Sequence, residues 1–204
     1  MGFYGKWLFP RMFDLVMQQQ QMIPVRKRIG EAATGRVVDI GIGSGLNLPF
    51  YGPQADGVVG IDPSPELLNL AEGRAHKALP PVELRRASGE ALPIEDQSID
   101  TAVVTFTLCT VDDAATTLAE IRRVLRPGGK LLFAEHGRAP ETGVARWQNR
   151  LTPVWRRIAG GCHLNRKPDE LIRAAGFSIE DMEAGYLKGP RPMAFVYAGS
   201  ARPS

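Results

Sequence analysis

The sequence predicts an α/β fold with a doubly wound, mostly parallel seven-stranded sheet that carries an antiparallel hairpin at one edge. From Gly35 onward, short apolar runs alternate with segments whose apolar residues recur at helical spacing. Such alternation is typical of parallel strands covered by helices on both faces. Near the C-terminus, two apolar runs follow each other without a helical spacer, which predicts the hairpin.

The expected elements begin with an N-terminal helix at Trp7–Glu31, in which Pro24 predicts a kink. Five parallel strands are expected at Arg36–Ile40, Gly57–Ile61, Val82–Ala87, Thr101–Phe106 and Lys130–Ala134. Helices are expected at Pro65–Leu79, Asp113–Leu125, Gly143–Ala159 and Pro168–Ala175. The two closing strands are expected at Ile179–Tyr186 and Met193–Ala198.

The N-terminal helix is expected to form a separate unit, residues 1–34, ahead of the main domain at residues 35–204. Its apolar stripe includes Met12, Phe13, Val16 and Met17. A stripe of this kind packs on the core, covers a lipophilic pocket as a lid, or faces a membrane as an anchor. The sequence alone leaves these alternatives open.

Composition indicates a globular protein, since 44% of the 204 residues are hydrophobic and 23% are charged. Two cysteines are too few for a disulfide framework, and the N-terminus lacks the pattern of a secretory signal. No apolar run is long enough to cross a bilayer. We therefore expect a cytoplasmic protein, either free or peripheral to a membrane.

The net charge of +3 conceals an uneven distribution. An acidic middle lies between two basic segments, residues 1–36 and residues 136–167, and the second holds seven Lys or Arg against one acid. The basic segments form a solvated surface, or they contact an anionic membrane or a phosphate-bearing substrate. Nucleic acid is not expected, because no recognised binding motif accompanies the charge.

A glycine-rich loop follows the first predicted strand, with the spacing Gly41-x-Gly43-x-Gly45 and an acid at Asp39. The dinucleotide fingerprint needs its third glycine one residue later, where Leu46 stands, so a nicotinamide oxidoreductase is disfavoured. S-Adenosylmethionine has no pyrophosphate to seat at the helix end. Its cationic sulfonium and amino-acid end suit an acid beside the glycines.

Asp62 and Pro63 end the second predicted strand, about twenty residues beyond the first glycine. An acid at this place accepts both ribose hydroxyls of an adenosine cofactor. The alternative is that Asp62 caps the following helix, and the two roles do not conflict.

Five motifs resemble the type 11 group of class I S-adenosylmethionine-dependent methyltransferases. They are Asp39-Ile-Gly-Ile-Gly-Ser-Gly45, Gly60-Ile-Asp-Pro-Ser64, Gly89-Glu-Ala-Leu-Pro93, Ser98-Ile-Asp100 and Arg123-Val-Leu-Arg-Pro-Gly-Gly129. The resemblance implies a Rossmann-like fold, S-adenosyl-L-methionine as cofactor and S-adenosyl-L-homocysteine as its product. A narrower resemblance, to the methyltransferase-like protein 7 family of thiol S-methyltransferases and bacterial relatives, rests on Thr105-Phe-Thr-Leu-Cys-Thr-Val111, Phe133-Ala-Glu-His136 and Gly161-Cys-His-Leu-Asn-Arg166.

The resemblance also implies cofactor contacts for each motif. Gly41, Gly43 and Gly45 would line the methionine part, with Asp39 near its amino group, and Asp62 would hold the ribose. Gly89, Glu90 and Ala91 would lie beside the adenine, and Thr105, Phe106 and Thr107 under the sulfonium. Ser88 stands where relatives often have an aspartate that accepts from the adenine amino group. The adenine contact is therefore expected to be weaker here, or made by the backbone.

On the acceptor side, His136 and His163 are the candidate catalytic residues. His136 and Glu135 end the fifth strand, at the sheet edge where open parallel sheets bind ligands. A general base is optional for methyl transfer to a thiol or an amine. Cys162 is expected to be a packed thiol, because this chemistry needs no covalent enzyme intermediate. No metal is expected.

Three functions remain after this reasoning. The preferred one is methyl transfer to a small lipophilic nucleophile, with a thiol as the best candidate. The second is N-methylation of a phospholipid, phosphatidylethanolamine, at a membrane surface, because bacterial phospholipid N-methyltransferases share the central motifs. The third is a cofactor-binding module without catalysis, which the intact set of glycines and acids disfavours. The sequence does not predict an oligomeric state.

Overall fold

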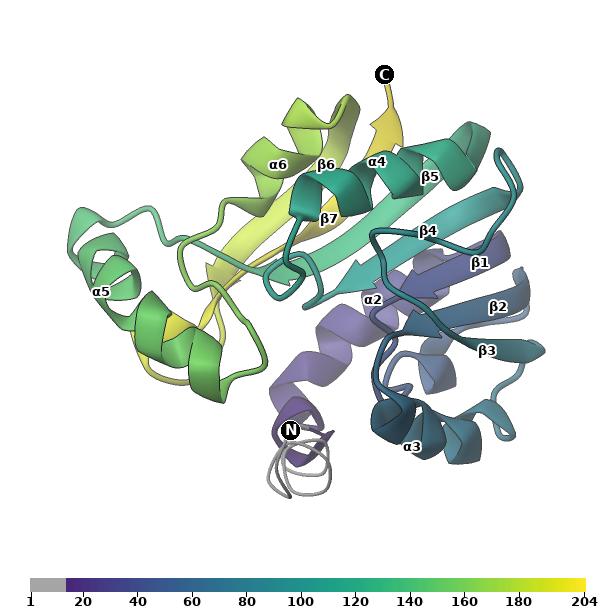
Figure 1. Cartoon of the computed structure of the whole chain (residues 1–204), viewed down its shortest axis with the longest axis horizontal. Helices are drawn as coiled ribbons and strands as arrows, with labels where there is room; N and C mark the ends of the chain where they lie inside the picture. The colour runs from purple at the N-terminus through teal and green to yellow at the C-terminus, as the bar shows by residue number, and fades with distance from the viewer. Residues whose placement is uncertain (1–13) are drawn as a thin grey trace.

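A computed structural model describes residues 14–204 and contains a seven-stranded sheet with the strand order β3-β2-β1-β4-β5-β7-β6 (Figure 1). The strands are β1 (Gly35–Ile40), β2 (Ala55–Asp62), β3 (Val82–Arg86), β4 (Ile99–Thr105), β5 (Leu125–His136), β6 (Phe177–Tyr186) and β7 (Phe195–Pro203). Strands β1 to β5 run parallel, and β7 pairs antiparallel with both β5 and β6. The predicted fold class, with its antiparallel edge hairpin, is confirmed.

Helices cover both faces of the sheet. They are α2 (Ile23–Ala32), α3 (Pro65–Ala75), α4 (Ala114–Val124), α5 (Thr142–Ile158) and α6 (Pro168–Ala174), with short 3-10 turns η2 (Gln20–Met22), η3 (Leu48–Phe50) and η4 (Arg191–Met193). Helices α4 and α6 pack on one face, and α2 and α3 pack on the other. Helix α5 extends to one side of the sheet (Figure 1). Within residues 14–204, no helix is both long and apolar enough to cross a membrane.

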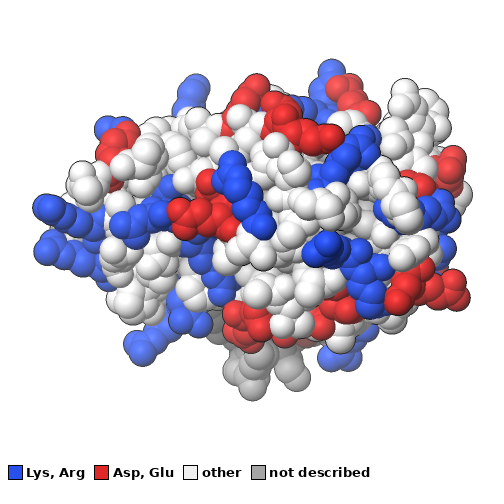
Figure 2. All heavy atoms as spheres, turned by 90° about the horizontal axis from the view of Figure 1, so that it is seen from above, with Lys and Arg blue, Asp and Glu red and all other residues white. Residues whose placement is uncertain are grey.

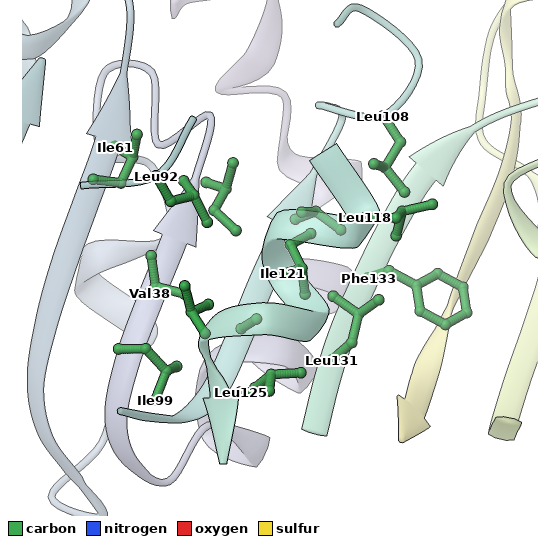
Figure 3. Close-up of a cluster of buried hydrophobic side chains, with 14 of the residues drawn as sticks. Val38, Ile61, Leu92, Ile99, Leu108, Leu118, Ile121, Leu125, Leu131 and Phe133 are labelled. Atoms are coloured by element: carbon green, nitrogen blue, oxygen red, sulfur yellow. The ribbon is translucent and has the colours of Figure 1, made fainter. Parts of the chain in front are cut away.

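The larger of the two apolar cores lies between the sheet and α4. Leu118 and Ile121 of α4 are fully buried against Val38, Leu131 and Phe133 of the strands (Figure 3). Each such side chain contributes roughly 1.5–3 kcal/mol through burial. This core fixes the order of the parallel strands, and with it the edge at which their carboxyl ends meet.

The N-terminal helix differs from the prediction. The helix is interrupted at Gln19, where φ is −54° and ψ is 135°. Helix α2 begins at Ile23. Pro24 occupies the first turn of α2, where its missing N–H needs no partner, so the expected kink at Pro24 is wrong. Met12 and Phe13 of the predicted apolar stripe lie outside the described residues. The division into residues 1–34 and 35–204 remains a prediction.

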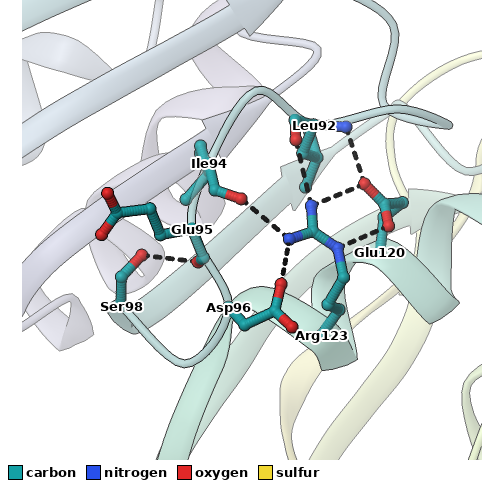
Figure 4. Close-up of polar contacts among 7 residues, drawn as sticks. All are labelled: Leu92, Ile94, Glu95, Asp96, Ser98, Glu120 and Arg123. Atoms are coloured by element: carbon teal, nitrogen blue, oxygen red, sulfur yellow. Dashed lines mark hydrogen bonds and ion pairs between the residues drawn. The ribbon is translucent and has the colours of Figure 1, made fainter.

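Arg123, from the fifth sequence motif, fixes the loop between β3 and β4 (Figure 4). Its guanidinium donates to the carbonyl oxygens of Leu92 and Ile94 and pairs with Asp96 and Glu120. Glu120 in turn accepts the Leu92 N–H at 2.8 Å. The motif therefore has a structural role: it holds the segment after Gly89 and Glu90 against α4.

Candidate active site

A cavity of about 440 Å³ opens where the carboxyl ends of β1, β2 and β4 meet. We call it the glycine-loop cavity. Nine of the residues predicted to bind the cofactor line it: Gly41, Gly43, Asp62, Pro63, Gly89, Glu90, Thr105, Phe106 and Thr107. Motifs far apart in the sequence therefore meet at one site, as expected for parallel strands.

Three of the predicted cofactor residues do not line the glycine-loop cavity: Asp39, Gly45 and Ala91. Ala91 is exposed outside it. Gly45 has a φ of +81°, and a Cβ atom there would lie 2.8 Å from Leu48 of η3 and 3.2 Å from Ala71 of α3. Backbone conformation and close packing together explain this glycine.

The loop after β1 needs glycine at Gly41. The residue has a φ of +69°, and a Cβ there would lie 2.2 Å from the Thr107 hydroxyl. Thr107 cannot easily move, because its hydroxyl donates to the Ile40 carbonyl at 3.0 Å. Gly43 has a φ of +57°, but a Cβ there would meet nothing closer than 3.9 Å.

Asp39 lies beneath the loop and is fully buried. One carboxylate oxygen accepts from the Tyr51 hydroxyl at 2.8 Å and from Asn47 at 3.1 Å. The other has no hydrogen-bond partner among residues 14–204. Burial raises the pKa of Asp39 to about 6, against the opposing effect of those hydrogen bonds. The contact between Asp39 and the amino group of the cofactor stays a prediction. It would be made by the carboxylate oxygen that has no partner among residues 14–204.

Asp62 ends β2 and lines the glycine-loop cavity. Its carboxylate accepts the N–H groups of Gly43 and Ser64, each at 2.9 Å. Burial raises its pKa above the ordinary value. The cap of α3 is Ser64, whose hydroxyl accepts the Leu67 N–H, so the alternative of Asp62 as the helix cap is wrong.

Arg26 is a site residue that the sequence reasoning missed. It projects from α2, is buried, and lines the glycine-loop cavity. It donates to Asn47 at 2.6 Å, while its Nε atom lacks a partner within residues 14–204. Burial lowers its pKa to about 10. Its helical spacing from Ile29 puts it on the buried face of α2, which was the available signal.

A second cavity, of about 380 Å³, adjoins the first; we call it the apolar cavity. The two share Met17, Phe106 and Thr110 in their linings. The walls of the apolar cavity come from residues 16–22, the C-terminal part of α5 and the connection between β6 and β7. Phe106, at the junction, has a φ of +56°, a strained conformation for a bulky residue that is often found at functional sites.

The two candidate catalytic histidines differ in position. His136 lines the apolar cavity beside Cys109 and Cys162. His163 lines neither cavity, and its backbone N–H donates to the Cys109 carbonyl at 2.7 Å. The structure therefore places His136 in the candidate site and His163 outside both cavities.

The loop between β4 and α4, residues 106–113, forms the wall between the cavities and is held from both sides. Glu135 is fully buried and accepts the N–H groups of Thr107 at 2.8 Å and Cys109 at 3.1 Å. Burial raises the Glu135 pKa to about 7. Arg166 donates to the carbonyl oxygens of Leu108, Val111 and Asp112. Both residues support the backbone of this loop.

Comparison with known proteins identifies the family. A methyltransferase domain family matches residues 38–133. The chain is 35% identical over 179 residues to the thiol S-methyltransferase TMT1B of Homo sapiens, covering 82% of this chain and 69% of that protein. The rat protein of the same name matches over 62% of its length. A phosphatidylethanolamine N-methyltransferase of Cereibacter sphaeroides is 35% identical, covering 72% of this chain and 76% of that protein.

Solved structures show the same fold. A possible histamine N-methyltransferase from Thermotoga maritima has a TM-score of 0.67 and 24% identity, covering 95% of this chain and 97% of that one. A methyltransferase from Mesorhizobium loti has a TM-score of 0.69 and 20% identity, covering 91% of this chain and all of the other. The matching domain family and the human relative, of which this chain covers 69%, show that the chain belongs to the S-adenosylmethionine-dependent methyltransferases, enzymes that use S-adenosylmethionine as methyl donor and release S-adenosylhomocysteine.

Proposed function

We propose that this enzyme methylates a small lipophilic thiol bound in the apolar cavity. The observation that carries the proposal is the lining of that cavity, which adjoins the glycine-loop cavity at Phe106 and Thr110. Among residues 14–204, no carboxylate lines it, and its ionisable groups besides the buried Cys109 are Lys188, His136 and Cys162. A neutral, lipophilic acceptor suits such a surface.

The residues around the glycine-loop cavity fit the methyl donor. Asp62 would hold the ribose, while Gly89 and Glu90 would lie beside the adenine. Arg26, a buried cation with an unpartnered Nε, would pair with the carboxylate of the methionine part. The bound donor supplies an electrophilic methyl carbon on a cationic sulfur. Gly41, Gly43, Thr105 and Thr107 would shape the wall around its methionine end.

The loop at residues 106–113 would align the two ligands. It lines both cavities, and Glu135 and Arg166 hold its backbone. Fixing the acceptor in line with the donor contributes about 7–11 kcal/mol in well-oriented reactions. The protein's main contribution would therefore be orientation and the exclusion of water.

Two observations favour a thiol over an amine. An ammonium substrate requires a carboxylate partner when it is desolvated, and the described lining of the apolar cavity offers none. A thiol is readily desolvated and becomes a strong nucleophile when it loses its proton. Relatives named thiol S-methyltransferases, at 33–37% identity, support the same choice.

A direct test uses purified protein with isotope-labelled donor and alkyl thiols of increasing chain length, each paired with the amine of the same chain. We expect labelled thioethers, with higher kcat/KM for longer chains and no methylated amine. Mass spectrometry identifies the product. Donor binding without methylation of any thiol in the panel would contradict the proposal, as would faster turnover of the amines.

A second candidate, phospholipid N-methylation at a membrane surface, is favoured by the outer face of α5. Trp147 and Val154 are 55% and 60% exposed there, among the exposed arginines Arg146, Arg150, Arg156 and Arg157. Figure 2 shows Lys and Arg gathered at the left end of the molecule, where α5 lies in Figure 1. Aromatic and cationic side chains together suit an anionic membrane interface.

Vesicles test this candidate. The protein should bind phosphatidylcholine vesicles that contain phosphatidylglycerol, with binding weakened by salt, and it should methylate phosphatidylethanolamine added to them. Replacing Arg156 and Arg157 by Gln should weaken vesicle binding. Replacing two charged residues on the far side, Arg85 and Arg86, serves as the matched control. Lipid methylation faster than thiol methylation would make this the primary activity.

A further inference from the structure

His136 lines the apolar cavity and has a buried ring nitrogen without a hydrogen-bond partner among residues 14–204. His136 is the last residue of β5, is 6% exposed, and lines the cavity. Its Nε2 atom is buried and has no hydrogen-bond partner among residues 14–204. Buried polar atoms in folded proteins are nearly always paired, so this nitrogen points to a partner supplied by a ligand.

The other ring nitrogen of His136 contacts a cysteine. Nδ1 lies 3.7 Å from the Cys162 sulfur, and Cys162 lines the same cavity. The pKa of Cys162 is lowered, chiefly by the neighbouring Cys109 thiol and then by His136. The same contact raises the pKa of Cys109. These contacts favour the thiolate form of Cys162.

A thiolate at this position selects one tautomer of His136. The anionic sulfur accepts a hydrogen bond, so Nδ1 carries the proton and Nε2 keeps a free lone pair. The other ionisable groups around the pair are Cys109 from the loop at residues 106–113, Glu135 from β5, Lys188 from the connection between β6 and β7, and Arg166 and His163 from the segment after α5. None of these side chains forms a hydrogen bond with Nε2, which has no partner among residues 14–204.

We propose that His136 and Cys162 form a proton-accepting pair for the methyl acceptor. This inference rests on the proposed thiol methylation. The S–H bond of the acceptor breaks, its electron pair stays on the acceptor sulfur, and an N–H bond forms at Nε2 of His136. The acceptor sulfur is then ready for methylation. Cys162 is a positioning residue: its sulfur accepts from Nδ1–H and so holds the tautomer that leaves Nε2 unprotonated. The proton passes to solvent after the product leaves.

The acceptor's own chemistry creates the need for this pair. Even a cysteine thiol, with a pKa of about 8.5, is only a few per cent ionised near neutral pH in water, and an unactivated alkyl thiol is less acidic still. An apolar cavity favours the neutral form further, because burial penalises the charge. An acidic aryl thiol is already ionised and needs no base. The two kinds of acceptor therefore distinguish a base from a merely structural histidine.

The variant His136→Asn keeps a donor near the Nδ1 position and removes Nε2. We expect kcat/KM for an alkyl thiol to fall about 100-fold or more, within the range for loss of a general base. For an acidic aryl thiol we expect a fall of less than about 5-fold. The matched control is His76→Asn, which makes the same change at an exposed residue at the end of α3. Calorimetric binding of S-adenosylhomocysteine checks that each variant is folded.

The outcomes separate this inference from the proposed function. If the wild-type enzyme methylates no thiol, the proposed function fails before the pair is tested. If the wild-type enzyme methylates alkyl thiols and His136→Asn loses the alkyl and aryl activities equally, the pair is not a base. Unchanged alkyl activity in that variant would overturn the inference as well.

Cys162→Ser tests the second member, because it keeps an acceptor for Nδ1–H and removes the charge. We expect kcat for alkyl thiols to fall about 10-fold, and kcat for an acidic aryl thiol to stay nearly unchanged. The difference follows because only the alkyl thiol needs the base that Cys162 orients. Equal falls for the two kinds of thiol, or no fall for either, would show that Cys162 only fills space.

Discussion

The glycine-loop cavity and the apolar cavity share a wall but are built in different ways. The first is formed by short motifs that directly follow β1, β2 and β4, with backbone and carboxylate groups in fixed positions. The second is assembled from residues 16–22, the end of α5, and the connection between β6 and β7. A cofactor common to a whole family needs the first kind of construction. An acceptor that varies between enzymes can be accommodated by changing the second, because its segments lie outside the central parallel strands.

The largest expected effect is on the glycine loop. Gly41→Ala places a Cβ against Thr107 and keeps a left-handed backbone, so we expect a loss of about 3 kcal/mol in the free energy of unfolding. The displaced loop should also weaken donor binding by more than about 100-fold. That loss corresponds to about 2.8 kcal/mol of binding free energy. Gly43→Ala is the control: it has similar backbone strain and open space, and should cost about 1 kcal/mol. Denaturant unfolding and calorimetry measure both, and equal losses would contradict the steric explanation.

The next effect concerns Asp62. Asp62→Asn removes the charge and one acceptor for the N–H groups of Gly43 and Ser64. We expect donor affinity to weaken about 30-fold, the size expected for a hydrogen bond to a charged group, with the thiol KM unchanged. Asp56→Asn on the same strand is exposed and should leave both values unchanged. A change in the thiol KM alone would contradict the assignment of Asp62 to the donor site in the glycine-loop cavity.

Arg166 tests the shared wall. Arg166→Met removes the donor to three backbone carbonyls in the loop at residues 106–113. We expect kcat to fall about 20-fold through misalignment of the two ligands, with smaller changes in donor affinity. Arg173→Met, which breaks an exposed ion pair with Asp169, should change kcat less than about 2-fold. Steady-state kinetics and donor titration would show whether the loop acts on alignment or on binding alone.

The smallest effect is expected from the wall of the apolar cavity. Met193→Trp fills space in that cavity without touching the glycine-loop cavity. The KM for the longest thiol should rise about 5-fold, on the order of 1 kcal/mol, while the shortest thiol and the donor bind as before. If the donor affinity changes instead, the two cavities are not the separate sites proposed here.

The same difference explains what the sequence could predict. The positions of Gly41, Gly43 and Asp62 follow from strands that end in loops, and parallel strands bring those loops to one edge. The apolar cavity has no such local pattern, because segments more than a hundred residues apart form it. His136 was predicted from its place at the end of β5, whereas the lowered pKa of Cys162 depends on Cys109, a neighbour only in the folded chain. Arg26 was missed for a similar reason, since its burial depends on Asn47 and the loop above it.

We propose that donor and acceptor occupy two adjoining cavities that meet at Phe106 and Thr110. A crystal structure with S-adenosylhomocysteine and a lipophilic alkyl thiol would locate both ligands. We expect the nucleoside beside Asp62 and Gly89, and the thiol in the apolar cavity with its sulfur near His136. A thiol bound outside the apolar cavity, or a nucleoside bound away from Asp62, would contradict it.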